Sequence, residues 1–128
     1  MTQEDKELIF KELCARLPYH VKCKIWIKDG TTEEGLLDLQ HNYGNVLHDY
    51  FYYNKIKDIK PYLFPLSSMT EEEKEEYCQL QQRVIYNSKG VINEDVTKYI
   101  NWCYKKHLDI NNLIPMELAI DATNLNIY

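Results

Sequence analysis

A proline-flanked run from residue 58 to residue 73 divides the chain into two parts with different hydrophobic periods. Before it, apolar and polar residues alternate, as in a strand with one buried face; after it, apolar residues recur every three or four positions, as in an amphipathic helix. The sequence therefore predicts a single α+β domain over residues 1–128, with a helix and a β unit in residues 1–64 and a helical unit in residues 65–128.

The first half is expected to begin with a helix and to continue as a small antiparallel sheet. Thr2 and Asp5 form an N-capping pair, and apolar residues at helical spacing predict an N-terminal helix over residues 3–16, which Pro18 ends. Short strands follow, separated by turns that contain Gly and Asn. We place them at residues 21–28, 35–39, 46–53 and 56–62, the last at a sheet edge because it contains Pro61.

Strands this short must protect their edges, and two arrangements do so. The sheet can curl into a small SH3-like barrel, or it can stay open while a helix packs across one face. The N-terminal helix is available for the second role, and the alternation of residues does not decide between the two arrangements.

The second half is expected to contain a C-terminal helical pair. Thr70 and Glu73 form a capping box, and the acidic residues that follow favour a helix N-terminus. This helix is expected to stop near Gly90, and Asn93 can cap the next one. Two helices joined by so short a loop pack antiparallel, and the segment from Asp109 onward is expected to dock as a short turn and an extended end.

The chain is acidic, and most of the excess charge lies in its second half. Lys and Arg number 15 and Asp and Glu number 20, which gives a net charge of −5, and residues 65–128 alone carry 6 − 10 = −4. An acidic protein gains little from the electrostatic attraction that drives non-specific nucleic-acid binding. Nucleic-acid binding would therefore need a local basic surface.

Cysteine usage and the N-terminus indicate the compartment. The four cysteines are widely spaced and include no Cys-x-x-Cys pair, which argues against a metal site and for free thiols on apolar faces. The first residues are acidic where a signal peptide is basic, and no apolar run approaches the ~18 residues of a membrane span. We expect a cytoplasmic protein without metal, cofactor or membrane contact.

No residue pattern predicts catalysis. Four histidines, at positions 20, 41, 48 and 107, are the natural general-base candidates, but none has a convincing partner in the sequence. The carboxylate pairs are expected to be solvated, and no phosphate-binding loop or nucleophile elbow occurs. We therefore expect a protein that is not an enzyme and has no catalytic residues.

Two surfaces are candidates for binding. Alternation along the first strand places a cationic row with one aromatic on its outer face, a surface that in small barrels binds single-stranded nucleic acid: Lys22, Lys24, Trp26 and Lys28. Lysines on an exposed strand can also serve only to prevent aggregation.

The second candidate surface is the aromatic run at residues 50–53. Alternation forces some of its rings out of a barrel interior, so the C-terminal helices must cover them or a partner protein must do so. We therefore expect Tyr50, Tyr52 and Tyr53 to bind a protein partner of unknown identity.

Two runs resemble a family of short uncharacterised proteins found in phage and other mobile-element regions of Bacteroidales. The first matches the family motif Lys-Pro-Tyr-Leu-x-Pro-Leu-Ser-Ser-Met-Thr-Glu-Glu at residues 60–72, and the second is the run from Trp102 through Asp109 to Ile114. The resemblance implies a bacterial cytoplasm with phage cargo, and it brings no particular activity with it. The leading hypothesis is therefore a non-enzymatic accessory or protein-interaction protein, and the alternative is a small-barrel protein that binds single-stranded nucleic acid.

Overall fold

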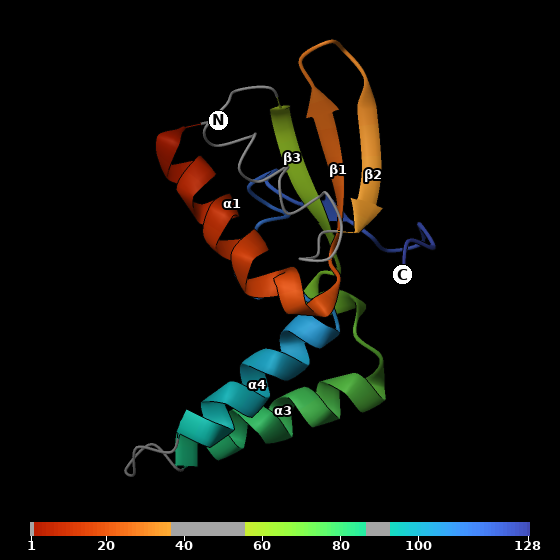
Figure 1. Ribbon diagram of the computed structural model, residues 1–128. Helices are drawn as coiled ribbons and strands as arrows, with labels where there is room; N and C mark the ends of the chain where they lie inside the picture. The colour runs from red at the N-terminus through yellow and green to blue at the C-terminus, as the bar shows by residue number, and fades with distance from the viewer. Residues whose placement is uncertain (1, 37–55, 87–92) are drawn as a thin grey trace.

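The computed structural model describes residues 2–36, 56–86 and 93–128. The third expected strand, residues 46–53, lies outside these ranges. The elements follow in the order α1 (Gln3–Arg16), η1 (Leu17–Tyr19), β1 (Lys22–Ile27), β2 (Thr32–Leu36), β3 (Ile56–Leu63), η3 (Leu66–Ser68), α3 (Glu71–Tyr86), α4 (Asn93–Lys105) and β4 (Ile120–Asp121). The expected mixed α+β fold is confirmed: a helix, a sheet and two further helices (Figure 1).

Both expected capping boxes are present. The Asp5 amide donates to Thr2 Oγ1 at 3.1 Å and the Thr2 amide donates to Asp5 Oδ2 at 3.1 Å, which fixes the start of α1. Thr70 and Glu73 exchange the same two bonds at the start of α3, at 3.0 and 3.1 Å. These side chains satisfy backbone N–H groups that the first helical turn leaves unpaired.

The described strands form an open sheet in the order β2-β1-β3-β4. β1 is antiparallel to both β2 and β3, and β4 is parallel to β3. Within the described residues the sheet does not close, so the open arrangement is observed and the SH3-like barrel is not.

Two expected strand positions need correction. The second strand begins at Thr32 and not at Gly35, because the Asp29-Gly30 turn is tight: the Ile27 amide donates to the Thr31 carbonyl at 2.9 Å, and pairing resumes at once. The first residues of this strand are polar, so hydrophobic spacing does not indicate where it starts. β3 is also an interior strand and not an edge; Pro61 is tolerated because it precedes the two residues of β3 that pair with β4.

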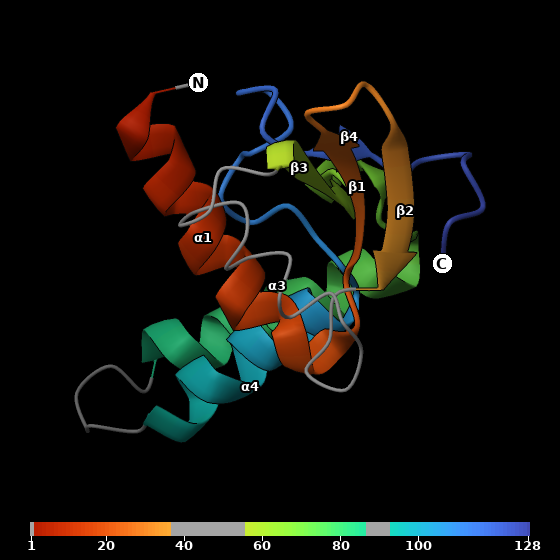
Figure 2. The same ribbon diagram turned by 45° about the horizontal axis from the view of Figure 1, so that its top comes forward.

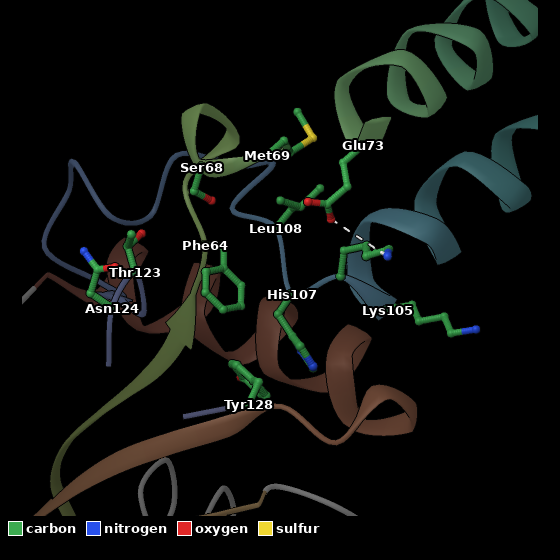
Figure 3. Close-up of a pocket in the computed structure, with 11 residues that line it drawn as sticks. Phe64, Ser68, Met69, Glu73, Lys105, His107, Leu108, Thr123, Asn124 and Tyr128 are labelled. Carbon is green, nitrogen blue, oxygen red and sulfur yellow. Dashed lines mark ion pairs between the residues drawn. The ribbon is translucent and has the colours of Figure 1, made fainter. Parts of the chain in front are cut away.

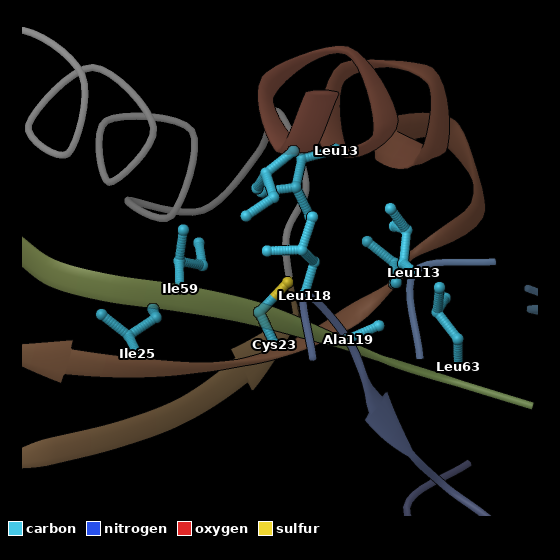
Figure 4. Packing of buried hydrophobic residues seen from close by; sticks show 10 residues of the cluster. Leu13, Cys23, Ile25, Ile59, Leu63, Leu113, Leu118 and Ala119 are labelled. Atoms are coloured by element: carbon cyan, nitrogen blue, oxygen red, sulfur yellow. The ribbon is translucent and has the colours of Figure 1, made fainter. Parts of the chain in front are cut away.

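The inner face of the sheet, which α1 covers, holds the core (Figure 4). Cys23 and Ile25 point inward from β1 and are about 1% exposed, while Lys24 and Trp26 point outward, as the alternation predicts. The buried cluster consists of Ile9, Leu13, Val21, Cys23, Ile25, Ile59, Leu63, Leu113, Leu118 and Ala119. Three of these residues come from the segment after α4, so this segment packs into the core together with α1.

The segment after α4 is joined to the end of β3 by backbone hydrogen bonds. The Phe64 amide donates to the His107 carbonyl at 2.8 Å, and the Asp109 amide donates to the Phe64 carbonyl at 2.8 Å. The two runs that carry the family resemblance therefore meet in space at this bridge.

α3 and α4 lie side by side and extend away from the sheet (Figures 1 and 2). Their contact includes the rings of Tyr77 and Tyr99, whose hydroxyls are 3.0 Å apart, and a hydrogen bond from Trp102 Nε1 to Glu76 at 2.9 Å. No residue of α3 is fully buried. Only the end of α4 nearest the sheet reaches the core, through Cys103.

None of the helices in the described part of the chain has the length and apolar character that crossing a lipid bilayer requires.

Candidate functional site

A groove of about 600 Å³ runs over the outer face of the sheet, on the side away from α1. Its floor comes from β1 and β3, and its wall comes from the segment after α4 and from the last residues of the chain. The lining residues are Lys24, Trp26, Lys60, Tyr62, Ile114, Glu117, Ala119, Ile120 and Leu125. The groove thus combines two aromatic rings and two cations with a wall that is apolar apart from Glu117.

Strand pairing brings the two cations to the same aromatic ring. Lys24 and Lys60 are direct partners across β1 and β3, so their side chains leave the sheet on the same face. Trp26 follows two residues along β1 and shares that face. The ammonium groups lie 5.4 Å (Lys24) and 5.7 Å (Lys60) from the centroid of the Trp26 ring, within the range of a cation–π interaction.

Two carboxylates near the groove accept hydrogen bonds from other groups of the fold. Glu34 accepts a hydrogen bond of 2.7 Å from the Tyr62 hydroxyl, and Asp58 accepts one of 2.8 Å from the Ile59 amide. Burial, with the nearby Glu34 carboxylate, raises the pKa of Tyr62, which keeps its hydroxyl a donor. Glu117 is exposed at the groove and leaves a charge of +1 on the lining residues, from 2 − 1.

The structure places the four predicted positions of the basic row differently. Lys24 and Trp26 come together as expected. Lys22 also faces outward, but its Nζ donates to the Ile127 carbonyl and its amide donates to the Tyr128 hydroxyl. Lys28 lies in the turn beyond β1, after a register shift between Trp26 and Ile27, and so leaves the row.

The predicted partner-binding residues Tyr50, Tyr52 and Tyr53 lie outside the described residues, as do the histidines at positions 41 and 48. The structure therefore bears on the basic surface and not on the aromatic run.

A second cavity, of about 490 Å³, lies where β3, α3 and the end of α4 meet (Figure 3). The His107 ring stacks on the Tyr128 ring with centroids 3.7 Å apart, and Lys106 Nζ lies 3.8 Å from a Glu73 carboxylate oxygen. Burial, together with the positive charges of Arg16, His20 and Lys22, lowers the pKa of His107 to about 4. This histidine is thus neutral near pH 7, and its buried Nδ1 has no hydrogen-bond partner among the described groups.

Lys60 is the cation of the groove that the sequence pattern did not predict. It lies in the run of residues 60–72, where it was attributed only to the family motif. A register for β1 against β3 would have placed it opposite Lys24, but alternation within a strand does not give the register between strands.

Among the described residues, no group of three or more His, Cys, Asp or Glu side chains is arranged to hold a metal ion. No family model, curated protein or solved structure matches the chain.

Proposed function

We propose that this protein is a non-catalytic binding protein whose groove holds a short stretch of single-stranded nucleic acid. The observation that carries the proposal is the Trp26 ring in a groove with two ammonium groups within 6 Å of its centroid. A base can stack on an indole ring whatever its identity, and the lysines can contact the phosphates on either side.

The size of the site limits its affinity. One stacked base contributes about 1–3 kcal/mol, and two lysine–phosphate contacts give a salt dependence of about −1.4 in log K against log [salt]. The net charge of −5 opposes any longer contact with a phosphate backbone. Binding is therefore expected to be weak, on the order of 10⁻⁴ M, and to cover only one or two nucleotides.

Fluorescence anisotropy with labelled oligothymidylate of about eight nucleotides, at low salt, tests the proposal. The double variant Lys24→Glu/Lys60→Glu and the variant Trp26→Leu should both abolish binding. The matched control is Lys74→Glu/Lys98→Glu, which makes the same change of net charge at exposed ion pairs of α3 and α4.

If the groove variant and the control variant lose the same amount of oligonucleotide affinity, only the overall charge matters, and this outcome contradicts a site at the groove. No binding by the unchanged protein at low salt would also overturn the proposal.

The structure also favours a second candidate, protein–protein contact through the far end of the α3–α4 pair. Ile85, Tyr86 and Val96 are 66%, 80% and 41% exposed, a concentration of large apolar side chains on helices that project from the sheet. The partner we propose is a second copy of the chain. The tip carries charges of both signs, whereas the first turn of α3 carries Glu71, Glu72 and Glu73, which would keep two copies apart there.

Sedimentation velocity over a range of concentrations tests this second candidate. The chain should dimerise, and Ile85→Glu/Val96→Glu should be monomeric, while Gln3→Glu/Thr32→Glu, an equal charge change at exposed polar positions of α1 and β2, should still dimerise. A monomer at every concentration excludes the second copy.

For both candidate functions, the proposal includes an accessory role in a phage or mobile element, as the resemblance implies.

A further inference from the structure

Residues 122–128 lie across one end of the groove and bind the remaining outward-facing lysine of β1. The Tyr128 hydroxyl accepts from the Lys22 amide at 2.9 Å and donates to the Tyr62 carbonyl at 2.7 Å, so it is inserted between β1 and β3. Lys22 Nζ donates to the Ile127 carbonyl and lies 5.8 Å from the Tyr128 ring centroid. Leu125, from the same segment, lines the groove.

Lys22 lies next to the groove, where its ammonium group could add a third cation to those of Lys24 and Lys60. It is two residues from Lys24 on β1, which places both side chains on one face about 7 Å apart along the strand. Its ammonium group differs from those of Lys24 and Lys60 in being bound by a backbone carbonyl of the chain's own last residues.

The bonds that hold this segment are individually modest. Ala122 is 1% exposed and its amide donates to the Leu63 carbonyl at 2.8 Å, so this residue anchors the segment. Residues 123–128 are held by hydrogen bonds to neutral groups, ring contacts of Tyr128 with His107 and Phe64, and one lysine–carbonyl bond, and Tyr128 is still 42% exposed. A phosphate accepts a charge-assisted hydrogen bond from an ammonium group that is stronger than one to a neutral carbonyl. A bound strand can therefore compete with the Ile127 carbonyl for Lys22.

We propose that residues 123–128, anchored at Ala122, act as a strap that withholds Lys22 and is displaced when a strand of several nucleotides enters the groove. The inference rests on the proposed nucleic-acid function and adds its regulation. Displacement extends the binding surface from two cations to three along β1 and β3. The closed strap then restricts the resting protein to a short, weak site.

The first test compares affinities for oligothymidylate of about eight nucleotides in three strap variants. Tyr128→Ala removes the hydroxyl bonds and the stack, so the strap no longer has to be displaced and binding should tighten about three- to tenfold. The salt slope should be about −2.1 in both proteins, because the third phosphate contact forms in each once the strap is displaced. Tyr128→Phe keeps the stack on His107 and should shift affinity less, in the same direction. Phe10→Ala, at an exposed aromatic residue of α1, should change neither quantity.

The second test asks whether the gain comes from Lys22. Adding Lys22→Gln to Tyr128→Ala should remove the third phosphate contact, which returns the affinity to about that of the unchanged protein and lowers the salt slope to about −1.4. Amide hydrogen exchange gives an independent measurement, because the Lys22 amide donates to Tyr128 and the Leu125 amide to the Ala122 carbonyl at 3.1 Å. Exchange at both amides should accelerate when oligothymidylate is added.

The outcomes separate this inference from the proposed function. If the unchanged protein binds and the Tyr128 variants bind with the same affinity, the strap is wrong and the nucleic-acid site stands. Protection of the Lys22 and Leu125 amides on binding would also overturn the strap. If neither the unchanged protein nor Tyr128→Ala binds, both proposals fail.

Discussion

Arg16 Nη2 donates to the carbonyl oxygen of Leu108 at 2.7 Å, although 92 residues separate the two in the sequence. The Arg16 side chain is fully buried, and its guanidinium also lies 3.1 Å from Glu12 Oε1 and 4.7 Å from the Tyr104 ring centroid. Asn111 Nδ2 donates to the other Glu12 oxygen at 2.7 Å. This buried network fixes the last turn of α1 against the segment that follows α4.

Breaking the buried pair on one side should be costly. Arg16→Met leaves the Glu12 carboxylate buried without its cation, and we expect the free energy of unfolding to fall by about 3 kcal/mol in urea denaturation. Lys98→Met, at the exposed Lys98–Glu94 pair, should cost about 0.5 kcal/mol or less. Equal effects of the two substitutions would contradict a structural role for the network.

Asp109 is expected to be essential for the turn that places Leu113 in the core. Its carboxylate accepts from the Leu113 amide at 2.8 Å and the Ile114 amide at 2.9 Å, and the residue is 3% exposed. Asp109→Ala leaves two backbone donors unpaired and should lower the free energy of unfolding by about 2–3 kcal/mol. Asp121→Ala removes one exposed bond to the Thr123 amide and should cost about 0.5 kcal/mol. Thermal or urea unfolding of both variants measures the difference.

His107 should make stability depend on pH below neutrality. Burial lowers its pKa from 6.5 to about 4 in the folded protein. Between these pH values the unfolded chain binds more protons than the folded protein, so stability decreases as the pH is lowered. Its contribution is complete above pH 6.5 and is lost as the pH falls towards 4, by about 2 kcal/mol after allowing for solvent screening of the partly exposed ring.

His107→Phe keeps an aromatic ring against Tyr128 and should flatten that part of the stability profile. Urea denaturation at several pH values gives the profile of each protein. An unchanged slope in the variant would mean that other groups cause the acid sensitivity.

Thiol labelling should distinguish the four cysteines by burial. Cys78 is exposed and should react first with iodoacetamide at about pH 8, and Cys14, which is half-buried, should react more slowly. Burial raises the pKa of Cys103 to about 11 and raises that of Cys23 as well, so both should stay unlabelled in the folded protein. All four should react at similar rates in urea, as mass spectrometry of peptides can show; early labelling of Cys23 would contradict the core described here.

Local features were determined by the sequence itself. The bounds of α1 follow from Thr2, the apolar spacing and the residues around Pro18, and the start of α3 follows from Thr70 and Glu73. The alternation along β1 predicted which side chains face inward. In each case the deciding interactions span a few residues of the chain, so composition and spacing contain the information.

Only the tertiary structure decided which distant residues meet. The pairing of β1 with β3 placed Lys60 beside Lys24 and Trp26, the docking of residues 122–128 bound Lys22, and the bond from Arg16 to Leu108 tied α1 to the segment after α4. None of these contacts leaves a periodic signal, because register and docking depend on the combined packing of several elements. The alternation of β1 therefore specified a cationic face, while long-range packing determined which of its lysines line the groove.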